Sequence, residues 1–489
     1  MKYYDYYYLA KRNLLPGSES RGRIIGQIKK GSKIHVSAVC GKAMASIACM
    51  LKESGHIVTG SDTKFSPPMK GVLQKYGIKE LKPSAKNLKG IDTLIIGNAL
   101  SYNSLESIES RKRGIATISG AEAVAEIFKN KRALVVTGTH GKTTTSALLT
   151  SVFIEAKKDP AYMIGGVFQN SDNSYSLGRK NSKFAIYEGD EYNCAYFDQG
   201  PKFLRYNASS VILTSIEHDH VDLYPTFEDY KQAFQFLIEN LPKDGFLVIH
   251  ESTLKLLDIS RCQAKVFIYG KSKSSDVYYT NKKTSSEHTT FEAISKFGKK
   301  KIQIPMFGEY NIENSLAVYI LSILEGIPQE TVIDALKSFP GTKERQELLG
   351  TNKGGSLVIR DYAHHPTAVS VTLDGIRDHY RNHRIVVVFE PRSNSSRKKV
   401  FENLYSKALE KADALVIINP EMKEGENLNQ LIDTNKIKET LISKNKMAYN
   451  TKSSEEALKM LGKIAKSNDV VVFMSSGDMD GIPKIFLEK

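Results

Sequence analysis

Residues 133–145 read Ala-Leu-Val-Val-Thr-Gly-Thr-His-Gly-Lys-Thr-Thr-Thr, an apolar run that enters a loop with two glycines. Gly138 and Gly141 permit a tight turn, and Lys142 and Thr143 follow at once. Backbone N–H groups, an ammonium and a hydroxyl therefore meet at a helix N-terminus, which is the pattern that holds a triphosphate with Mg²⁺. The segment predicts a buried strand, a phosphate loop and a helix in an α/β domain.

The loop departs from the general nucleoside triphosphate pattern, G-x-x-x-x-G-K-[ST], whose first glycine would stand where this chain has Val136. The alternative is a plain strand-to-helix turn with Thr137 as its cap. Such a turn does not explain why lysine precedes threonine. A lysine on the β/γ-phosphates and a threonine on Mg²⁺ do explain that order, so a nucleotide site is the favoured interpretation.

The bulk properties favour an intracellular protein of several domains. A chain of 489 residues suggests about three domains. Its four cysteines show neither a C-x-x-C pair nor metal-ligand spacing, and no apolar run reaches the length of a membrane span, so we expect reduced thiols and a cytoplasmic location with no membrane partner. The net charge of +15 is scattered, which favours solvated surface over a nucleic-acid partner.

The first predicted unit is a βαβ segment with a strand at 34–39, a helix around 45–54 and a strand at 57–60 that leads to Asp62. An acidic residue about 20 residues beyond a glycine turn holds a ribose in Rossmann domains. The turn has Gly41 alone where a dinucleotide fingerprint has three glycines, so an NAD-dependent oxidoreductase is disfavoured. A nucleotide on this first domain remains the expectation.

Apolar runs separated by helical stretches continue to the C-terminus and predict a third, parallel α/β domain. We expect a first domain over 32–130, a central one over 131–340 that ends at Phe339-Pro340-Gly341, and a third over 341–489. Residues 1–31 form an extension of unknown role. The expected strands are 93–96, 184–187, 211–214, 357–360, 384–389, 414–418 and 470–474. We also expect two helices at the end of the central domain, 314–325 and 331–338.

Polar clusters follow several of these strands. Glu188-Gly189-Asp190-Glu191 and Glu217-His218-Asp219-His220 come after two central strands, and the carboxyl ends of parallel strands share an edge with the phosphate loop. These side chains can therefore converge on the same ions, although ordinary surface charge is the alternative for either cluster alone. In the third domain, residues 361–366 and 390–394 form two more strand-end loops of the kind that bind ligands.

Five segments in this order resemble the Mur ligases: T-G-T-H-G-K-T-T-T at 137–145, E-G-D-E at 188–191, E-H-D-H at 217–220, G-E-Y-N-I-E-N at 308–314 and D-Y-A-H-H-P at 361–366. The resemblance covers about residues 33–482. It implies an α/β fold of three domains: a Rossmann-like N-terminal domain for a UDP-sugar, a central P-loop ATPase-like domain, and a Rossmann-like C-terminal domain for the incoming amine. It also implies an ATP-dependent ligase that forms a C–N bond.

Three stretches resemble most the murein peptide ligases, a branch of this family: 191–198 with 202–206, the loop 390–394, and 60–62 leading to 66–69. This implies that L-Ala-γ-D-Glu-meso-diaminopimelate is joined to the lactoyl carboxylate of UDP-N-acetylmuramate through an acyl phosphate, in peptidoglycan recycling. The alternative is the family's L-alanine-adding reaction on the same sugar. The other implied partners are ATP and Mg²⁺, and the implied state is a monomer or weak homodimer.

The resemblance also implies roles for individual residues at the metal ion, at ATP and at the substrates. Lys142, Glu188 and His220 are implied as catalytic, and Thr143, Glu188 and His220 as the shell of Mg²⁺. The implied ATP-binding residues are Gly138, Thr139, His140, Gly141, Lys142, Thr143, Thr144, Asn311 and Asn314 at the adenine, Arg345 at the phosphates, and Asp361 at the ribose. The implied substrate-binding residues are Gly41 and Asp62 for the UDP moiety, with Asn170, His364 and Arg392.

The chain departs from the family at several of these places. Ser37, Lys42 and Ser46 replace small or glycine residues of the first loop, and Gly189 replaces an alanine. Tyr310 replaces a histidine beside the adenine, and Arg360 replaces an acidic residue. Phe234 stands where several Mur ligases carry a modified lysine, which the muramate-linked members also lack.

Overall fold

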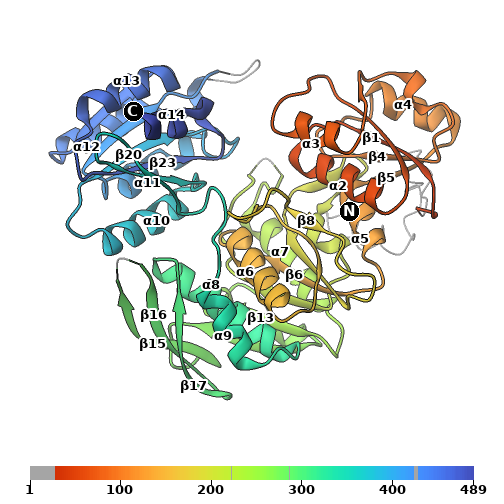
Figure 1. Cartoon of the computed structure of the whole chain (residues 1–489), viewed down its shortest axis with the longest axis horizontal. Coiled ribbons are helices and arrows are strands. Elements are labelled where there is room, and N and C mark those ends of the chain that lie inside the picture. The colour runs from red at the N-terminus through yellow and green to blue at the C-terminus, as the bar shows by residue number, and fades with distance from the viewer. Residues whose placement is uncertain (1–27, 222, 286, 423–427) are drawn as a thin grey trace. The chain divides into compact units, whose positions relative to one another are not determined.

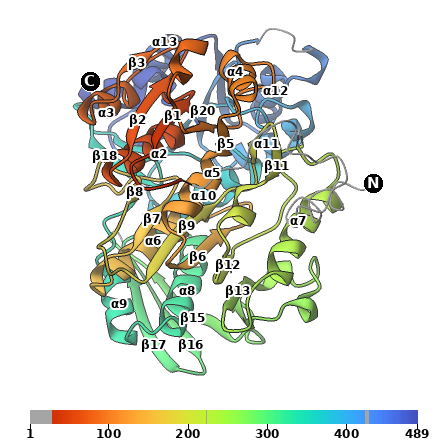
Figure 2. The same ribbon diagram turned by 90° about the vertical axis from the view of Figure 1, so that its right-hand side faces the viewer.

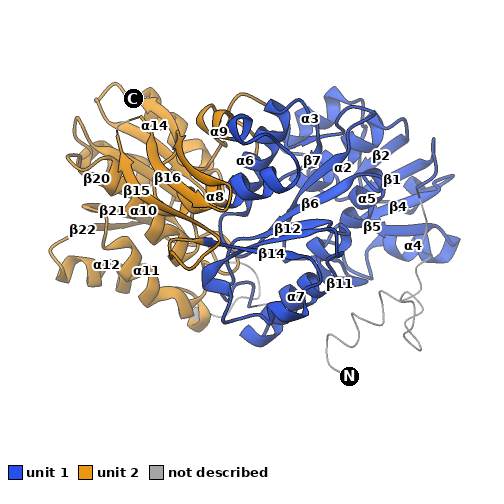
Figure 3. Ribbon diagram, turned by 90° about the horizontal axis from the view of Figure 1, so that it is seen from below, with its two compact units in different colours: residues 1–165, 172–269, 317–332 blue, residues 166–171, 270–316, 333–489 orange. Residues whose placement is uncertain are grey.

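The computed structural model describes residues 28–489 except 222, 286 and 423–427. Most of the expected N-terminal extension therefore lies outside the described residues. The chain forms two compact units, drawn in blue and orange in Figure 3. Unit 1 contains residues up to 165, 172–269 and 317–332, and unit 2 contains 166–171, 270–316 and 333–489. The expected domain boundaries near 130 and 340 stay predictions.

The N-terminal part of unit 1 is a parallel sheet of five strands in the order β3-β2-β1-β4-β5. Figures 1 and 2 show its helices beside it. The strands are β1 (Lys33–Ser37), β2 (Ile57–Ser61), β3 (Glu80–Leu81), β4 (Thr93–Ile96) and β5 (Ala116–Ser119), and the helices are α2 (Lys42–Glu53), α3 (Met69–Lys75), α4 (Leu105–Arg113) and α5 (Gly120–Ile127). The βαβ unit predicted from the sequence is confirmed, and its β2 ends immediately before Asp62.

The rest of unit 1 is built on a mostly parallel run of strands in the order β14-β13-β12-β6-β9-β7-β8. Its strands are β6 (Arg132–Thr137), β7 (Ala161–Met163), β8 (Tyr175–Ser176), β9 (Phe184–Gly189), β12 (Ser210–Leu213), β13 (Phe246–His250) and β14 (Lys265–Gly270), with helices α6 (Lys142–Glu155) and α7 (Phe227–Glu239) and the hairpin β10 (Asn193–Ala195) and β11 (Asp198–Pro201). The edge strand β8 is antiparallel to β7.

Strand β6 lies between β12 and β9 and has no solvent-exposed surface from Leu134 to Val136. A strand covered on both faces must be apolar throughout, which is the run that the sequence shows. The register places Val136 opposite Ile212 of β12 and Glu188 of β9. The phosphate loop and the first polar cluster therefore leave the sheet at the same level.

Unit 2 contains an antiparallel group of three strands that the sequence analysis did not predict, β15 (Val277–Thr284), β16 (Thr289–Ser295) and β17 (Gly298–Ile304). Many of their outward positions carry lysine, threonine or glutamate, so an apolar run does not mark them. The helices α8 (Glu309–Leu324) and α9 (Gln329–Lys337) follow, and their residues 317–332 belong to unit 1. The expected helices 314–325 and 331–338 correspond to these two, with α8 beginning five residues earlier.

The second sheet of unit 2 has six strands in the order β18-β19-β23-β20-β21-β22. Its strands are β18 (Glu347–Thr351), β19 (Leu357–Asp361), β20 (Ile385–Glu390), β21 (Ala414–Ile418), β22 (Met447–Thr451) and β23 (Val470–Ser475), and its helices are α10 (Pro366–His379), α11 (Glu402–Leu409), α12 (Thr434–Ser443), α13 (Ser454–Ile464) and α14 (Ile482–Glu488). Successive residues of β20, such as Val387 and Val388, point to opposite faces of the sheet and belong to separate buried clusters. Both faces are therefore covered by helices, as in other doubly wound sheets.

The expectation of a parallel third sheet is correct for five strands and wrong at one edge. Strand β18 pairs antiparallel with β19, while β19, β23, β20, β21 and β22 are mutually parallel. A short connection from β18 to β19 forces the antiparallel direction, because a parallel neighbour needs a longer crossover. Among the described residues, no helix is long and apolar enough to cross a membrane.

Candidate active site

The phosphate loop follows β6 and ends at Gly141, the N-cap of α6. Gly138 has φ of 124° and Gly141 has φ of 81°, which are left-handed conformations that favour glycine. A Cβ on Gly138 would lie 2.3 Å from Oγ1 of Thr214. The alternative with Thr137 as a helix cap is wrong, since the Thr137 hydroxyl donates to the carbonyl of Gly189.

Strand β12 and the residues after it hold this loop from one side. The Thr139 N–H donates to the carbonyl of Ser215 over 2.9 Å, and the His140 N–H donates to Oγ of Ser215 over 3.0 Å. The Thr214 hydroxyl donates to the carbonyl of His140 over 2.6 Å. These contacts fix the loop, which leads directly into the first turn of α6, where the backbone N–H groups of a helix point outward. That arrangement suits an anion.

The ammonium of Lys142 lies within the loop. Its Nζ donates to the carbonyls of Gly138 (2.8 Å) and Thr139 (3.2 Å) and to the carboxylate of Glu191 (2.9 Å to Oε2). Burial opposes the positive charge, but the carboxylates of Glu191 and Asp190 outweigh it, so the pKa of Lys142 is raised. The lysine is therefore charged at any physiological pH, as a phosphate contact requires.

Thr143 and Glu188 form an oxygen-rich pair beside the loop. The Thr143 hydroxyl donates to Oε1 of Glu188 over 2.7 Å, and Oε2 of Glu188 accepts from the Gly165 N–H over 2.6 Å. A hydroxyl and a carboxylate are hard ligands of the kind that Mg²⁺ takes in phosphoryl-transfer sites. The donor set therefore fits the ion that the sequence implies.

His220 lies with the other end of the first polar cluster. Ligand atoms of His220, Asp190 and Glu191 are within 4.8 Å of one another, and the ring of His220 lies 4.2 Å from that of Tyr192. Burial opposes ionisation of Asp190, but Lys202 and Lys142 outweigh it and lower the pKa of this carboxyl well below its usual range. The structure thus places Thr143 with Glu188, and His220 with Asp190 and Glu191, at the carboxyl end of β9.

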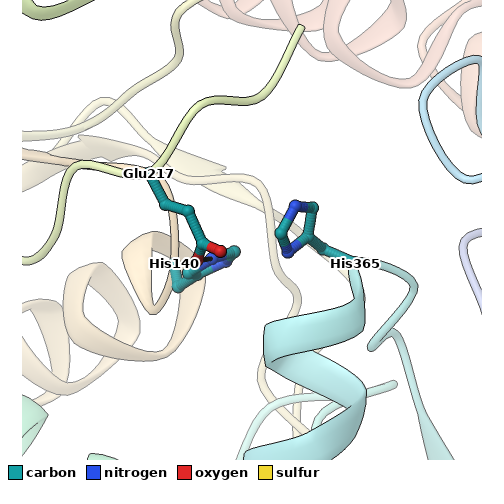
Figure 4. A group of neighbouring side chains, drawn as sticks. All are labelled: His140, Glu217 and His365. Carbon is teal, nitrogen blue, oxygen red and sulfur yellow. Dashed lines mark hydrogen bonds and ion pairs between the residues drawn. The ribbon is translucent and has the colours of Figure 1, made fainter. Parts of the chain in front are cut away.

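His140 faces the second polar cluster. Its Nε2 is 2.7 Å from Oε2 of Glu217 (Figure 4). Both side chains are partly exposed. His365, also drawn in Figure 4, belongs to unit 2, where its side chain accepts from the Thr367 N–H as the N-cap of α10.

Unit 2 holds the residues that the sequence assigns to the base and ribose of ATP. Asn311 and Asn314 lie one turn apart at the start of α8, where Nδ2 of Asn314 donates to Oδ1 of Asn311 over 3.2 Å. Asp361 ends β19, and its carboxylate accepts from the N–H groups of Gln346 and Ala363, both over 2.8 Å. The guanidinium of Arg345 lies 4.5 Å over the ring of Tyr362.

The expected UDP side lies at the carboxyl ends of β1 and β2. Gly41 is the N-cap of α2, and Oδ2 of Asp62 accepts from the neighbouring Cys40 N–H over 2.8 Å. A cavity of about 360 Å³ opens beside Asp62 and is lined by Thr63, Lys64, Phe65, Glu80, Leu81 and Lys82. Its lysines and aromatic ring suit an anionic nucleotide.

The Ser37 departure is explained by a buried carboxylate. The Ser37 hydroxyl donates to Oε2 of Glu106 over 2.5 Å, and Oε1 of Glu106 receives bonds from Ser61 (2.8 Å) and Asn87 (2.8 Å) and lies 3.2 Å from Nε2 of His35. Glu106 is 3% exposed. Burial opposes its charge, but these hydrogen bonds outweigh it and lower its pKa to about 2.

The other departures of the first loop have simpler surroundings. Lys42 is exposed at the first position of α2, and the Ser46 hydroxyl donates to its carbonyl over 3.1 Å. Free thiols occur at Cys40, Cys49, Cys194 and Cys262.

The expected amine side is split between several loops of unit 2. Arg392 follows β20 and is about half exposed, with Nη1 3.6 Å from Glu390 and 3.8 Å from Asp478. Nδ1 of His364 is 2.9 Å from the carbonyl of Tyr362. Asn170 is exposed in a turn whose neighbour Gln169 donates its N–H to the carbonyl of Gly341.

Arg360 and a glycine shape the loop opposite Arg392. The guanidinium of Arg360 donates to the carbonyls of Gly477 (2.6 Å) and Asp478 (3.3 Å) and pairs with Glu344 at 3.0 Å. A Cβ on Gly477 would lie 2.4 Å from Cδ of Arg392. A side chain at position 477 would therefore displace Arg392 from its present path, and the unusual Arg360 has a defined structural role.

The chain matches the Mur ligase family in three consecutive stretches: the Mur ligase family catalytic domain over residues 33–132, the Mur ligase middle domain over 136–322, and the Mur ligase glutamate ligase domain over 344–477. Together they cover most of its length. This protein is a Mur ligase.

Curated relatives and solved structures agree with this family. The UDP-N-acetylmuramate–L-alanine ligase of Buchnera aphidicola subsp. Acyrthosiphon pisum (strain Tuc7) is 30% identical over 482 residues, which cover 94% of this chain and 96% of the relative. That of Endomicrobium trichonymphae is 31% identical over 457 residues, covering 92% and 97%. A murein peptide ligase structure from Psychrobacter arcticus 273-4 superposes with a TM-score of 0.69 at 26% identity, covering 94% and 98%. A UDP-N-acetylmuramate–alanine ligase structure from Thermotoga maritima shares the fold, with a TM-score of 0.76 at 24% identity over 93% and 98%.

Mur ligases are ATP-dependent enzymes that form amide bonds, and this one is therefore such an enzyme. Sequence reasoning found the loop of this Mur ligase and both polar clusters, in which it placed Glu191 only as a candidate ion ligand and not as the partner of Lys142, and it gave no role to Glu106 or Gln346. Glu191 stood inside a motif, so its position was visible. Glu106 and Gln346 lie in segments with no motif, and their contacts depend on residues 15 to 71 positions away.

Proposed function

We propose that this Mur ligase joins L-Ala-γ-D-Glu-meso-diaminopimelate to the lactoyl carboxylate of UDP-N-acetylmuramate in peptidoglycan recycling. One observation favours a peptide over a single amino acid as the amine substrate: Arg392 is about half exposed and lies between Glu390 and Asp478. Fixed charges of both signs on an open strand end match a peptide that carries several carboxylates and two amines. The loop sequence 390–394 supports the same branch of the family.

The reaction would take two steps. A carboxylate oxygen of the sugar attacks the γ-phosphorus and ADP leaves, which gives an acyl phosphate. The α-amine of the peptide then attacks the acyl carbon, inorganic phosphate leaves, and the nitrogen loses a proton. Phosphorylation is needed because the oxygen of a free carboxylate is a poor leaving group.

The residues of unit 1 would serve the first step. The loop N–H groups and Lys142 would bind the β- and γ-phosphates and stabilise charge on the transferring group. Thr143, Glu188 and His220 would hold Mg²⁺, which supplies charge neutralisation on the phosphate oxygens. In unit 2, Asn311 and Asn314 would bind the adenine, Asp361 the ribose and Arg345 the phosphates.

The remaining assigned residues would bind the two acceptors. Gly41 and Asp62 would bind the UDP moiety of UDP-N-acetylmuramate. Asn170, His364 and Arg392 would bind substrate near the place where the amide bond forms. We propose a cytoplasmic enzyme that needs no nucleic acid and acts as a monomer or weak homodimer.

The second candidate is the addition of L-alanine to the same sugar, and the names of the curated relatives favour it. One assay separates the two: ADP release is measured with UDP-N-acetylmuramate, ATP and Mg²⁺ and with either the tripeptide or L-alanine as the amine. Tripeptide-dependent release with a joined product on mass spectrometry supports the proposal. Faster turnover with L-alanine would replace it with the second candidate.

A further inference from the structure

Gln346 lies in the loop before β18 and has a left-handed backbone, with φ of 47°. Its N–H donates to Oδ2 of Asp361 over 2.8 Å. A non-glycine residue in this region persists only where its surroundings determine it. The side chain of Gln346 shows what those surroundings are.

The side-chain amide of Gln346 joins the start of α8 to this loop. Its Nε2 donates to the carbonyl of Phe307 over 2.9 Å and to the Tyr310 hydroxyl, and its Oε1 accepts from Nδ2 of Asn311 over 3.1 Å. Nδ2 of Asn311 also donates to the Phe307 carbonyl over 2.9 Å. Because both hydrogens of Nδ2 have acceptors and Oδ1 accepts from Asn314, the orientation of the Asn311 amide is fixed.

We propose that Gln346 is a positioning residue that sets the amide orientation of Asn311 and Asn314, and thereby makes the site prefer adenine to guanine. The inference rests on the proposed function, which assigns these two asparagines to the base. Asn311 donates both of its Nδ2 hydrogens, to Gln346 and to Phe307, so the donor to the base comes from Asn314, whose Nδ2 gives one hydrogen to Asn311 and has a second beside its Oδ1. That donor and acceptor match N7 and the N6 amino group of adenine, whereas guanine presents two acceptors on that edge. A reversed amide would lose this match.

Tyr310 belongs to the same network. Burial and the carboxylate of Asp361 raise the pKa of its hydroxyl, so the hydroxyl stays neutral, and its oxygen accepts from Nε2 of Gln346. The tyrosine that replaces the family's histidine thus acts with Gln346, and a glutamine here gives that hydroxyl a partner.

Two variants test the proposal, Gln346→Leu and Gln346→Glu, with Gln303→Leu on β17 as the matched control at another half-buried glutamine. The full-length protein is titrated with ADP and with GDP in the presence of Mg²⁺ by calorimetry. We expect Gln346→Leu to lower the preference for ADP over GDP about 10-fold, since one well-placed base contact is worth about a factor of ten. Gln346→Glu keeps an acceptor for Asn311 and should therefore lower the preference for ADP over GDP by a smaller factor.

A merely structural role would lower thermal stability and leave the ADP to GDP ratio unchanged. An unchanged ratio in folded Gln346→Leu and Gln346→Glu would overturn the proposal, as would a wild-type protein that does not prefer ADP. If Gln346→Leu does not fold, Gln346→Met, which also removes the acceptor for Asn311, takes its place. Nucleotide binding needs neither sugar nor amine, so a protein that prefers ADP but joins no peptide would contradict the proposed function and leave this inference standing.

Discussion

Lys142 of the phosphate loop and Glu191, three residues beyond Glu188, form an ion pair at 2.9 Å, and the Glu191 carboxylate is 1% exposed. Tyr230 donates its hydroxyl to the same carboxylate over 3.1 Å, and the Tyr224 hydroxyl donates to the Glu191 carbonyl over 2.7 Å. The lysine that would contact the nucleotide therefore also neutralises a buried carboxylate. Function and stability are coupled at this one side chain.

Replacement of Lys142 with methionine should reduce ATP turnover at least about 1,000-fold, because a positioned charge on a transferring phosphoryl group contributes several kcal/mol to the transition state. Steady-state ADP release with saturating sugar and amine measures the effect. The exposed Lys89→Met is the control and should keep wild-type turnover. Activity near wild type in Lys142→Met would contradict the assignment of this loop.

The same variant should be less stable by about 3 kcal/mol, since removal of one partner leaves a buried carboxylate without compensation. Adding Glu191→Gln removes that charge, and the double variant should regain most of the loss. Urea unfolding of the wild type, both single variants and the double variant gives the coupling energy. Additive effects would show that the pair contributes no specific stabilisation.

Gly138→Ala should lower turnover at least about 100-fold, because the new Cβ would lie 2.3 Å from Thr214 in a left-handed backbone and would displace the loop from the phosphates. Gly71→Ala in α3 is the matched control, since its new Cβ meets no atom within 4 Å. The measured quantities are the KM for ATP and kcat. Equal behaviour of the two variants would show that the loop geometry is not required.

Stability should depend on Glu106 in acid. Its pKa is about 2 in the folded protein against an ordinary value of 4.5. A depressed pKa stabilises the folded state fully above about pH 4.5, and this stabilisation is lost as pH falls towards 2. Glu106→Gln should therefore cost about 3 kcal/mol at pH 6 and much less at pH 3, as measured by urea unfolding.

Glu109→Gln is the control for this experiment, because Glu109 lies on the same helix and pairs with Arg113 at the surface. Its effect should stay below about 1 kcal/mol at both values of pH. A cost of Glu106→Gln that does not change with pH would show that packing rather than charge accounts for it.

Arg360→Met should raise the KM for the amine substrate about 10-fold and leave the KM for ATP unchanged, because Arg360 donates to the carbonyls of Gly477 and Asp478 opposite Arg392. Arg360→Lys should recover only part of the loss, since an ammonium cannot reproduce the planar guanidinium contacts. Initial rates over a range of amine concentrations give both constants. An equal change in both KM values would indicate a general loss of structure.

The sequence predicted the parallel strands well, because buried parallel strands are continuous apolar runs such as 414–418, which is β21 residue for residue. It did not predict β15, β16 and β17, whose outward lysines and threonines hide the pattern. The phosphate loop was found because its residue types follow from chemistry within a few positions. Gln346 and Glu106 were not, because their partners come together only through the fold.

Gly477 also bears on the engineering of amine specificity. A Cβ at this position would lie 2.4 Å from Cδ of Arg392, so that side chain would have to move from its present place beside Glu390 and Asp478. Neighbouring Asp478 and Asp480 are exposed but not neutral positions, because Asp478 lies 3.8 Å from Arg392 and Asp480 has a left-handed backbone with φ of 51°. A search for new acceptor peptides would therefore keep residues 477, 478 and 480 constant and vary the exposed Arg392 itself.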